Sequence, residues 1–320
     1  MNVWQRLSKP IFALAPMEDV SDSVFRQIVN SCGRPDVSFT EFTNVEGMHS
    51  RGRDAVIHRL KFTEGERPII AQVWGTKPED YRQAACELVE MGFDGIDINM
   101  GCPQKDVMKN GACAALVNNP TLAKEIIIAT REGAGEAPVS VKTRIGFNSI
   151  SSDSWISHLL SCGVAALTVH GRTAAEMSKV PCHWDEIAKA VAIRNDMKLE
   201  TVILGNGDVS SRVDGLAKIA QYGVDGVMIG RAVFDDPWVF DRTSPKPAHT
   251  NRELLELMKK HVVLFETTWD TTKNYAVLKK FYKIYIRGFD GASDWRVRAM
   301  ETNSPSDMYP IIDELLSIVN

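Results

Sequence analysis

The chain has 320 residues, of which 44% are hydrophobic and 24% are charged. This composition excludes a disordered chain, and the length suits one large domain of about 250 residues plus a smaller one. The formal net charge of −4 excludes a general basic field, so any nucleic-acid partner must be held by a local basic patch.

The six cysteines are widely scattered and contain no Cys-x-x-Cys pair: Cys32, Cys86, Cys102, Cys113, Cys162 and Cys182. This pattern predicts reduced thiols and indicates neither a disulfide framework nor a zinc site, so we expect no metal. The segment from Met1 to Met17 has an apolar run too short for a signal peptide or a membrane span. We therefore expect a cytoplasmic protein that does not enter a membrane.

In chain order, eight short β-rich runs are expected at Ile11–Ala15, Val37–Phe42, Pro68–Trp74, Gly95–Asn99, Pro138–Thr143, Ala165–His170, Thr201–Gly205 and Gly226–Gly230. Segments with helical periodicity lie between most of them, for example Lys77–Met91, Thr121–Arg131, Asp153–Ser161, Trp184–Arg194 and Val209–Tyr222. This alternation predicts parallel strands joined by crossover helices. Eight such strands favour an α/β protein with a closed (β/α)₈ TIM barrel, although counting alone leaves an open sheet possible.

A Pro-Lys-Pro linker between Ser244 and Thr250 separates the expected barrel from helical patterns that run to Asn320. We therefore predict a barrel domain over residues 1–243 and a small C-terminal helical domain over residues 251–320. The stretch from Lys273 to Arg298 carries a local charge of +5 and includes Lys279, Lys280 and Lys283. It favours contact with nucleic-acid phosphates, and the alternative is a solvated basic helix face.

The segment from Asp94 to Pro103 is expected to place a thiol at the mouth of the barrel. Its strand cannot continue past Asn99, because Gly101 frees the backbone and Pro103 lacks an N–H donor. Cys102 therefore lies on a turn at the carboxyl end of a strand, where parallel barrels build active sites. This position makes Cys102 a candidate acid or nucleophile, with a small buried turn residue as the alternative.

Polar groups at the ends of the middle strands suggest a flavin. Gln72, Lys142 and His170 supply an amide, a cation and a titratable ring, which suit the polar edge of a flavin, where a cation stabilises the anionic reduced ring. Each residue also has an ordinary structural explanation, such as a turn contact or a near-core imidazole.

Glycine-rich turns after the last two strands suggest a phosphate. Asn206-Gly207 and Gly230-Arg231 combine open backbone with a cation, as phosphate sites in such barrels do. A sugar-phosphate enzyme would use the same device. No Gly-x-Gly-x-x-Gly motif follows the first strand, so the pattern indicates FMN rather than an adenine dinucleotide.

Six motifs in this order resemble those of the tRNA-dihydrouridine synthases: Ala15-Pro16-Met17, Asn99-x-Gly101-Cys102-Pro103, Val141-Lys142-Thr143-Arg144, His170-Gly171-Arg172-Thr173, Asn206-Gly207-Asp208 and Ile229-Gly230-Arg231. The resemblance covers nearly the whole chain. Its most specific part is the Gly-Cys-Pro loop, which continues through Val107 and Gly111–Leu116.

The resemblance implies an FMN-bearing (β/α)₈ barrel, a helical domain that grips tRNA, and NADPH as the reductant of the flavin. It makes Cys102 the catalytic residue. It assigns the following residues to FMN: Pro16, Met17, Glu18, Gln72, Lys142, His170, Asn206, Gly207, Asp208, Gly230 and Arg231.

The chemistry of uracil reduction gives Cys102 a specific task. Reducing the C5–C6 bond requires a hydride at C6 from the flavin and a proton at C5 from the opposite face. A thiol with a pKa of about 8.5 stays protonated near pH 7, so Cys102 needs no activating base to donate. Asn99 is expected to hold the uracil edge, and Arg144 and Arg172 to meet the ribose or phosphate.

The chain departs from the family pattern at two places. Glu176, Met177 and Ser178 stand where a glutamine and a tyrosine usually follow the His-Gly-Arg-Thr motif, which leaves the substrate contacts of that loop open. Cys113 stands where glycine or another small residue is commoner, and we interpret it as structural.

Two rival functions stay open at this point. A small-molecule FMN oxidoreductase, such as a dihydroorotate dehydrogenase or an ene-reductase, would explain the flavin groups but not the basic tail. A non-catalytic RNA-binding barrel would explain the tail but not Gln72, Lys142 and Cys102 together. The residues do not decide which uridine is modified, the preference for NADPH over NADH, or the oligomeric state, for which a monomer is favoured.

Overall fold

The computed structural model describes residues 1–243 and 249–319. Within them, one sheet contains the strands β1 (Ile11–Leu14), β2 (Val37–Phe39), β3 (Thr43–Asn44), β4 (Ile69–Trp74), β5 (Gly95–Met100), β6 (Val139–Arg144), β7 (Ala166–His170), β8 (Val202–Asn206) and β9 (Gly226–Ile229). The strand order is β2-β1-β9-β8-β7-β6-β5-β4-β3, and all the pairings are parallel. Because β2 also pairs with β4, the sheet closes on itself.

The predicted (β/α)₈ barrel is confirmed. Each of the eight predicted runs overlaps one of the barrel strands β1, β2 and β4 to β9, with ends shifted by up to three residues. The two-residue strand β3 pairs with β4 beyond the closing contact and was not anticipated.

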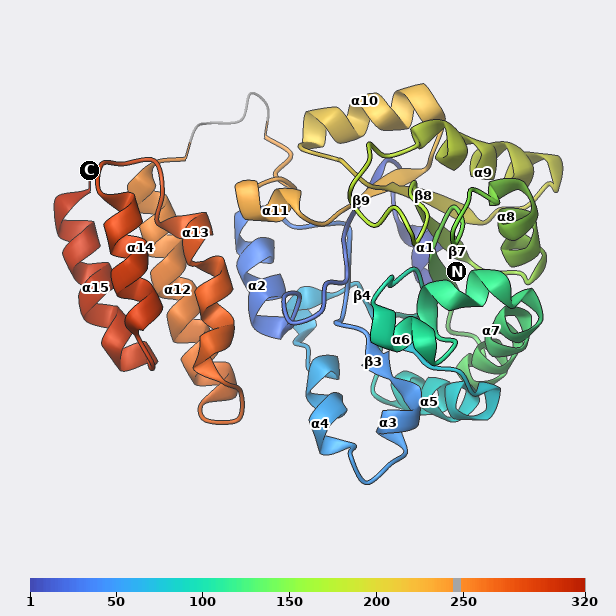
Figure 1. Ribbon diagram of the computed structural model, residues 1–320, viewed down its shortest axis with the longest axis horizontal. Helices are drawn as coiled ribbons and strands as arrows, with labels where there is room; N and C mark the ends of the chain where they lie inside the picture. Colours follow the sequence, from blue (N-terminus) through green and yellow to red (C-terminus); the bar gives the residue numbers. More distant parts are fainter. Residues whose placement is uncertain (244–248, 320) are drawn as a thin grey trace. The chain divides into compact units, whose positions relative to one another are not determined.

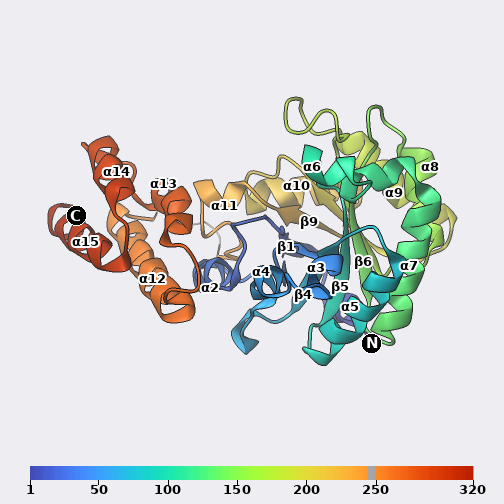
Figure 2. The same ribbon diagram turned by 60° about the horizontal axis from the view of Figure 1, so that its bottom comes forward.

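Helices surround the strands (Figures 1 and 2). Those of the barrel are α1 (Val3–Arg6), α3 (Val45–Met48), α4 (Asp54–Ile57), α5 (Pro78–Glu90), α6 (Lys105–Lys109), α7 (Pro120–Ala134), α8 (Ser152–Ser161), α9 (Trp184–Asp196) and α10 (Arg212–Tyr222). Short 3₁₀ turns occupy His58–Leu60, Glu64–Glu66 and Cys113–Asn118. The five predicted amphipathic segments correspond to α5, α7, α8, α9 and α10.

Local signals explain where these helices begin and end. Helix α5 starts with Pro78, whose fixed φ suits the first helical position and whose missing N–H is not needed there. Helix α10 begins after Ser211, which accepts a hydrogen bond from the backbone of Asp214, and it ends at Gly223 with φ at 70°. Such caps fix the length of the crossovers and hence the spacing of the strands.

The lower part of the barrel interior is apolar. Ile11 and Ala13 of β1, Phe39 of β2 and Ile70 of β4 are fully buried there, together with residues of β7, β8 and β9. Trp4 of α1 belongs to the same cluster, with its ring centroid 6.3 Å from that of Phe39. Burial of these side chains supplies the hydrophobic stabilisation of the barrel.

The chain divides into two compact units, Met1–Ser23 with Pro35–Gly230, and Val24–Arg34 with Arg231–Asn320. The second unit holds most of α2 (Ser23–Cys32), then α11 (Ala232–Asp235), α12 (Asn251–Trp269), a 3₁₀ turn (Tyr275–Phe281), α13 (Tyr282–Tyr285), α14 (Ala292–Glu301) and α15 (Pro305–Ile318). The domain bounds 1–243 and 251–320 stay a prediction. Residues 244–248 of the predicted linker lie outside the described residues.

Aromatic packing organises the second unit around α2. The rings of Phe25 and Phe281 stack with centroids 4.9 Å apart, and Phe25 also stacks on Phe234 at 6.1 Å. The imidazole of His261 is hydrogen-bonded to the hydroxyl of Tyr285 at 2.8 Å. The apolar face of α2, which the sequence did not separate from the barrel, therefore belongs to the helical core.

Candidate active site

Polar side chains replace apolar ones in the upper part of the barrel interior. The strand register places Asn99 beside Lys142, and His170 beside Asn206. Alternation along each strand directs these residues to the same side as the buried core below them. The structure therefore brings four of the sequence-predicted residues together at the carboxyl ends of neighbouring strands.

Gln72 is buried and uses both ends of its amide. Its Nε2 donates to Asp97 Oδ2 at 2.6 Å, and its Oε1 accepts from Asn99 Nδ2 at 3.1 Å. Ser140 Oγ donates to the other oxygen of Asp97 at 2.6 Å. Sequence reasoning missed Asp97 and Ser140, although an acidic residue in mid-strand between two isoleucines was an available signal.

The turn that carries Cys102 is held by Asn99. Asn99 Oδ1 accepts hydrogen bonds from the backbone N–H groups of Gly101 and Cys102, both at 3.0 Å. The Cys102 carbonyl in turn accepts from the N–H of Ala114 at 3.3 Å. The Asn99 amide is thus engaged inside the protein, and its predicted contact with uracil stays a prediction.

The thiol of Cys102 is more acidic than the sequence suggested. A hydrogen bond from Cys113 lowers the pKa of Cys102 to about 7, and Lys142 and Arg144 act in the same direction. This acidity differs from that of the ordinary thiol expected from the sequence, and it makes the protonation of Cys102 sensitive to pH near neutrality.

Cys113 has more than a filling role. Its side chain is fully buried, and its φ of 53° is a left-handed conformation that glycine adopts more readily than other residues. Burial raises the pKa of Cys113 well above its ordinary value, so it stays a thiol that donates to Cys102.

Lys142 places a cation at the mouth. Burial lowers the pKa of Lys142 to about 8, and the neighbouring Arg144 contributes in the same direction. Among the described residues, its ammonium forms no hydrogen bond or ion pair, although Asp97 and Cys102 act on it electrostatically. A partly buried ammonium with no such partner suits an anionic or carbonyl-bearing ligand.

Arg144 ties two loops together. Its guanidinium donates to the carbonyl of Gly101 at 2.7 Å, of Thr173 at 3.0 Å and of Met177 at 3.2 Å. Burial lowers the pKa of Arg144 to about 10. The structure thus places Arg144 against the Cys102 turn, and its predicted contact with ribose or phosphate stays a prediction.

The turn after β8 contains a glycine that its conformation and its neighbours require. Gly207 has φ at 120°, and a Cβ there would lie 2.6 Å from Cys182 Sγ, so the position requires glycine. At Gly230 a Cβ would meet its nearest atoms at 3.6 and 3.7 Å, in Ala15 and Met17. Asn206 Nδ2 donates to the carbonyl of Met228 at 2.8 Å and so joins the two turns.

Arg172 and Asp208 form an ion pair beside these turns. Arg172 is buried, donates to the Asp208 carboxylate and to the Val180 carbonyl, and lies 3.3 Å from His170 Nε2. Asp208 also accepts from the N–H of Cys182 at 3.0 Å. Arg172 therefore orients protein groups, and its predicted contact with the substrate stays a prediction.

The remaining predicted flavin residues follow β1 and β9 in the chain. Pro16 and Met17 are partly buried after β1, and the Met17 N–H donates to Ser21 Oγ at 2.8 Å. Glu18 forms an ion pair with Arg59 at 2.8 Å. Arg231 is exposed directly before α11 and belongs to the second unit.

The loop that departs from the family pattern is closed on itself. Glu176 accepts a hydrogen bond from the N–H of Thr173 at 2.8 Å and lies 3.0 Å from His183 Nε2. Met177 has φ at 52°, and 41% of its surface is exposed. The side chain of Met177 is thus presented to solvent.

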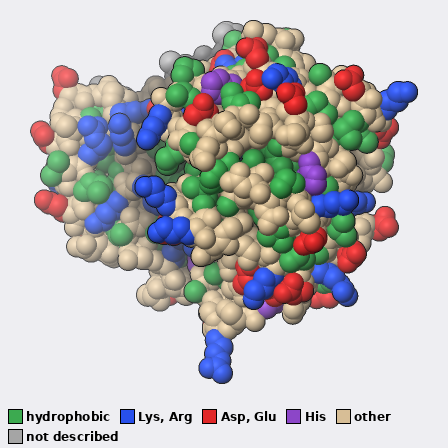
Figure 3. Space-filling model, turned by 45° about the vertical axis from the view of Figure 1, so that its right-hand side comes forward, with side chains coloured by type: hydrophobic (Ala, Val, Ile, Leu, Met, Phe, Trp, Pro, Cys, Tyr) green, Lys and Arg blue, Asp and Glu red, His purple; other side chains and the backbone are tan. Residues whose placement is uncertain are grey.

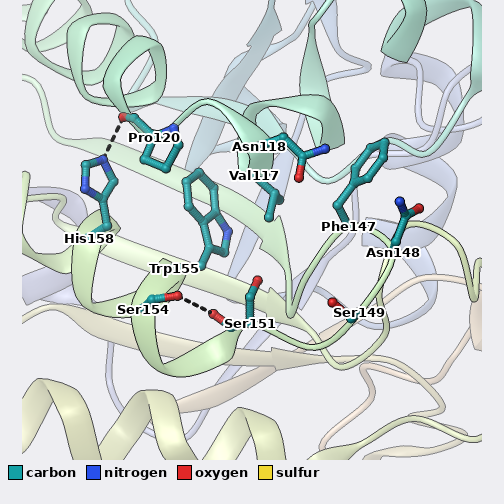
Figure 4. A pocket seen from close by; sticks show the side chains of 10 residues that line it. All are labelled: Val117, Asn118, Pro120, Phe147, Asn148, Ser149, Ser151, Ser154, Trp155 and His158. Carbon is teal, nitrogen blue, oxygen red and sulfur yellow. Dashed lines mark hydrogen bonds between the residues drawn. The ribbon is translucent and has the colours of Figure 1, made fainter.

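A separate cavity of about 440 Å³ has the segment 117–120 on one side and the loop after β6 with the start of α8 on the other (Figure 4). Phe147, Trp155 and His158 line it together with serine and asparagine side chains. No charged side chain among the described residues lines this cavity, so it does not suit a phosphate group. The cofactor assignment therefore rests on the barrel mouth.

Cations of the second unit differ in how far their side chains are exposed. Lys279 Nζ donates to the carbonyl of Met300 at 2.8 Å, and Arg298 forms an ion pair with Glu314 at 2.7 Å. Lys280 and Lys283 have exposed side chains. Figure 3 shows one face of the molecule, on which basic and acidic side chains are mixed.

Comparison with known proteins identifies the family. The family model described as "Dihydrouridine synthase (Dus)" matches residues 13–318. The chain belongs to the dihydrouridine synthase family. It is 45% identical over 316 residues to a probable tRNA-dihydrouridine synthase 2 of Bacillus subtilis, covering 98% of this chain and 96% of the relative. It is 44% identical to a probable tRNA-dihydrouridine synthase of Staphylococcus aureus, covering 98% and 95%.

Among solved structures, this dihydrouridine synthase family member is similar in fold to a morphinone reductase variant in complex with tetrahydroNAD. The TM-score is 0.51 with 13% sequence identity, over 73% of this chain and 86% of the reductase. That likeness concerns the barrel fold. In the described residues, no helix is long and apolar enough to cross a membrane, and no group of three or more His, Cys, Asp or Glu could hold a metal ion.

Proposed function

We propose that this dihydrouridine synthase family member is a flavin-dependent oxidoreductase that reduces the C5–C6 bond of uridines in tRNA, with FMN at the barrel mouth and NADPH as reductant. The observation that carries the proposal is the placement of an acidified Cys102 thiol and the Lys142 ammonium at one mouth. The two relatives with this name cover almost the whole chain. A cytoplasmic monomer stays our expectation.

The residues at the mouth fit FMN. Gln72, Lys142 and His170 would face the polar edge of the ring, and the glycine turns at Gly207 and Gly230 would receive the phosphate. The other residues assigned to the cofactor are Pro16, Met17, Glu18, Asn206, Asp208 and Arg231. When bound, reduced FMN supplies a hydride to uracil C6.

The protein's own part in the reaction is the proton at uracil C5, which Cys102 donates from its Sγ. Only the thiol form can do this, so the pKa of about 7 makes the step depend on pH near neutrality. Asn99 and Arg144 hold the turn that carries Cys102, by hydrogen bonds to its N–H and to the Gly101 carbonyl. They fix the direction in which the thiol points.

The exposed cations of the second unit would bind tRNA phosphates. Lys279, Lys280 and Lys283 are the proposed contacts, because they lie in the basic stretch from Lys273 to Arg298 and because the side chains of Lys280 and Lys283 are exposed. A uridine in folded tRNA must also turn out of its stack to reach the barrel mouth.

The test is to incubate the purified full-length protein with NADPH and with tRNA transcribed without modifications. The proposal predicts dihydrouridine, detected as a nucleoside heavier than uridine by two hydrogen atoms. If NADPH reduces the flavin but no dihydrouridine forms in the tRNA, the rival function is favoured, an FMN oxidoreductase acting on a small molecule. Absence of flavin from the protein would exclude both.

A further inference from the structure

Asp97 is a charged residue in the interior of the barrel for which neither the sequence motifs nor the proposed reaction accounts. Its side chain is fully buried on β5, and burial raises the pKa of Asp97 to about 6. An ionisable group in such a place costs stability unless hydrogen bonds compensate. The compensating donors are Ser140 Oγ and Gln72 Nε2, both at 2.6 Å.

The hydrogen bonds from Asp97 continue to the turn that carries Cys102. The Gln72 amide is hydrogen-bonded to both Asp97 and Asn99. The Asn99 oxygen in turn accepts hydrogen bonds from the backbone N–H groups of Gly101 and Cys102. The side-chain amides of Gln72 and Asn99 thus form an unbroken hydrogen-bonded chain between a buried carboxylate and the turn with the proposed proton donor.

The direction of every bond in this chain is fixed from both ends. The N–H groups of the turn only donate, so Asn99 must present its oxygen to them and its NH₂ group to Gln72. Gln72 must then present its oxygen to Asn99 and its NH₂ group to Asp97. An ionised carboxylate only accepts, so Asp97 satisfies this arrangement and opposes a flipped amide.

We propose that Asp97 is a positioning residue, which orients the amides of Gln72 and Asn99 and thereby holds the turn of Cys102 in place. Ser140 supports this role because its hydroxyl occupies the second oxygen of Asp97 and restrains rotation of the carboxylate. Asp97 contacts neither Cys102 nor the turn directly, and it acts through the two amides.

This inference deepens the proposed function, since it explains how the proposed proton donor is aimed. It also has consequences in the ligand-free chain. Without Asp97, the Gln72 amide is free to flip, and a flip would set its NH₂ group against that of Asn99. Asn99 would then release the N–H groups of Gly101 and Cys102, which would exchange with solvent more readily.

The test is a double-mutant cycle read by hydrogen exchange at the Gly101 and Cys102 amides of the full-length protein. Asp97→Ala should speed exchange at both amides about tenfold, in line with the loss of a buried hydrogen bond. Asn99→Ala should do so at least as much. Because Asp97 acts through Asn99, the double variant should exchange no faster than Asn99→Ala alone.

Two further variants sharpen the test. Asp97→Asn keeps an acceptor oxygen for Gln72 and should retain slow exchange, whereas Ser140→Ala leaves the bond between Asp97 and Gln72 and should have a small effect. If Asp97→Ala does not fold, Gln72→Leu breaks the same chain and should release the same two amides.

Unchanged exchange at Gly101 and Cys102 in Asp97→Ala, or an effect that adds fully to that of Asn99→Ala, would overturn the positioning role. In turnover with tRNA, Asp97→Ala should lower kcat and leave KM for tRNA nearly unchanged. Exchange rates are measured without substrate. A failure of the wild-type protein to reduce tRNA would therefore refute the proposed function and leave the exchange result to decide the role of Asp97.

Discussion

The lower and upper parts of the barrel interior use the same strand alternation with opposite chemistry. Below, Phe39, Ile70 and their neighbours form an apolar core that contains no charge. Above, the inward positions carry Asp97 and Lys142. Burial raises the pKa of Asp97 and lowers the pKa of Lys142, so it favours the neutral form of each side chain. The difference indicates that the lower layers stabilise the fold and that the upper layers lower its stability in return for a reactive site.

The largest effect that this comparison predicts is on catalysis, from an upper residue. Cys102→Ala should reduce dihydrouridine formation by about 10²- to 10⁴-fold, the range for loss of a general acid. Flavin content and its reduction by NADPH should stay nearly unchanged, because the hydride and the proton are delivered separately. Cys86→Ala, at an exposed thiol, is the control. Near wild-type turnover in Cys102→Ala would remove the proposed proton donor.

A substitution in the lower layer should act on stability instead. Phe39→Ala should lower the free energy of unfolding by roughly 3–5 kcal/mol, because Phe39 is fully buried and packs near Trp4. Denaturant titration measures this loss. The folded fraction should keep the pH dependence of the wild-type enzyme, and a shift of that dependence would show that the two layers are not separable.

The lysines of the second unit differ from Lys142 in that they are proposed to bind tRNA and not the flavin. Replacing Lys279, Lys280 and Lys283 together with alanine should reduce the salt dependence of tRNA binding by up to about three units of log K against log[salt], if each meets one phosphate. Reduction of the flavin by NADPH should not respond. Equal slopes for the variant and the wild type would mean that these lysines are solvated by water and do not contact tRNA.

Lys142→Met should separate binding from stability. Loss of a charge-assisted contact should weaken flavin retention about tenfold or more, since such contacts contribute roughly 1.5–3 kcal/mol. The pKa of Lys142 is lowered in the folded state, so its charge opposes folding below that pKa, and its removal should leave the unfolding free energy equal or higher at pH 7. Flavin absorbance after dialysis and a denaturant titration measure both.

The smallest predicted effect is a shift in pH dependence. The rate of turnover with tRNA should be highest below pH 7. It should fall as the pH rises through about 7, because ionisation of Cys102 removes the proton that it donates. Cys113→Ala removes the hydrogen bond that lowers the pKa of Cys102, so the falling limb should move toward 9.0, the ordinary value for the thiol. An unmoved limb would exclude Cys113 from any part in this acidity.

The sequence predicted the barrel because its strands are short apolar runs whose periodicity differs from that of the helices between them. Polar residues at strand ends, such as Gln72 and Lys142, were also predictable, since parallel strands bring their carboxyl ends together. The bond between Gln72 and Asp97 was not. It depends on which residues of neighbouring strands lie side by side, and register is a three-dimensional property.

The acidity of Cys102 could not be predicted for a similar reason. Cys113 is eleven positions further along the chain, and only the folded loop places its thiol against that of Cys102. Helix α2 follows the first strand in sequence and yet packs with Phe281 and Phe234. The order of elements along the chain does not reveal that this helix packs in the helical core.

The central claim, that the polar mouth holds a flavin which tRNA oxidises, is tested most directly by one anaerobic absorbance experiment. The purified full-length protein is reduced with a limiting amount of NADPH and then mixed with unmodified tRNA. We predict that the flavin absorbance is lost on reduction and returns when unmodified tRNA is added. It should not return when the added tRNA already carries dihydrouridine. A protein without flavin absorbance, or a reduced flavin that unmodified tRNA does not reoxidise, would contradict it.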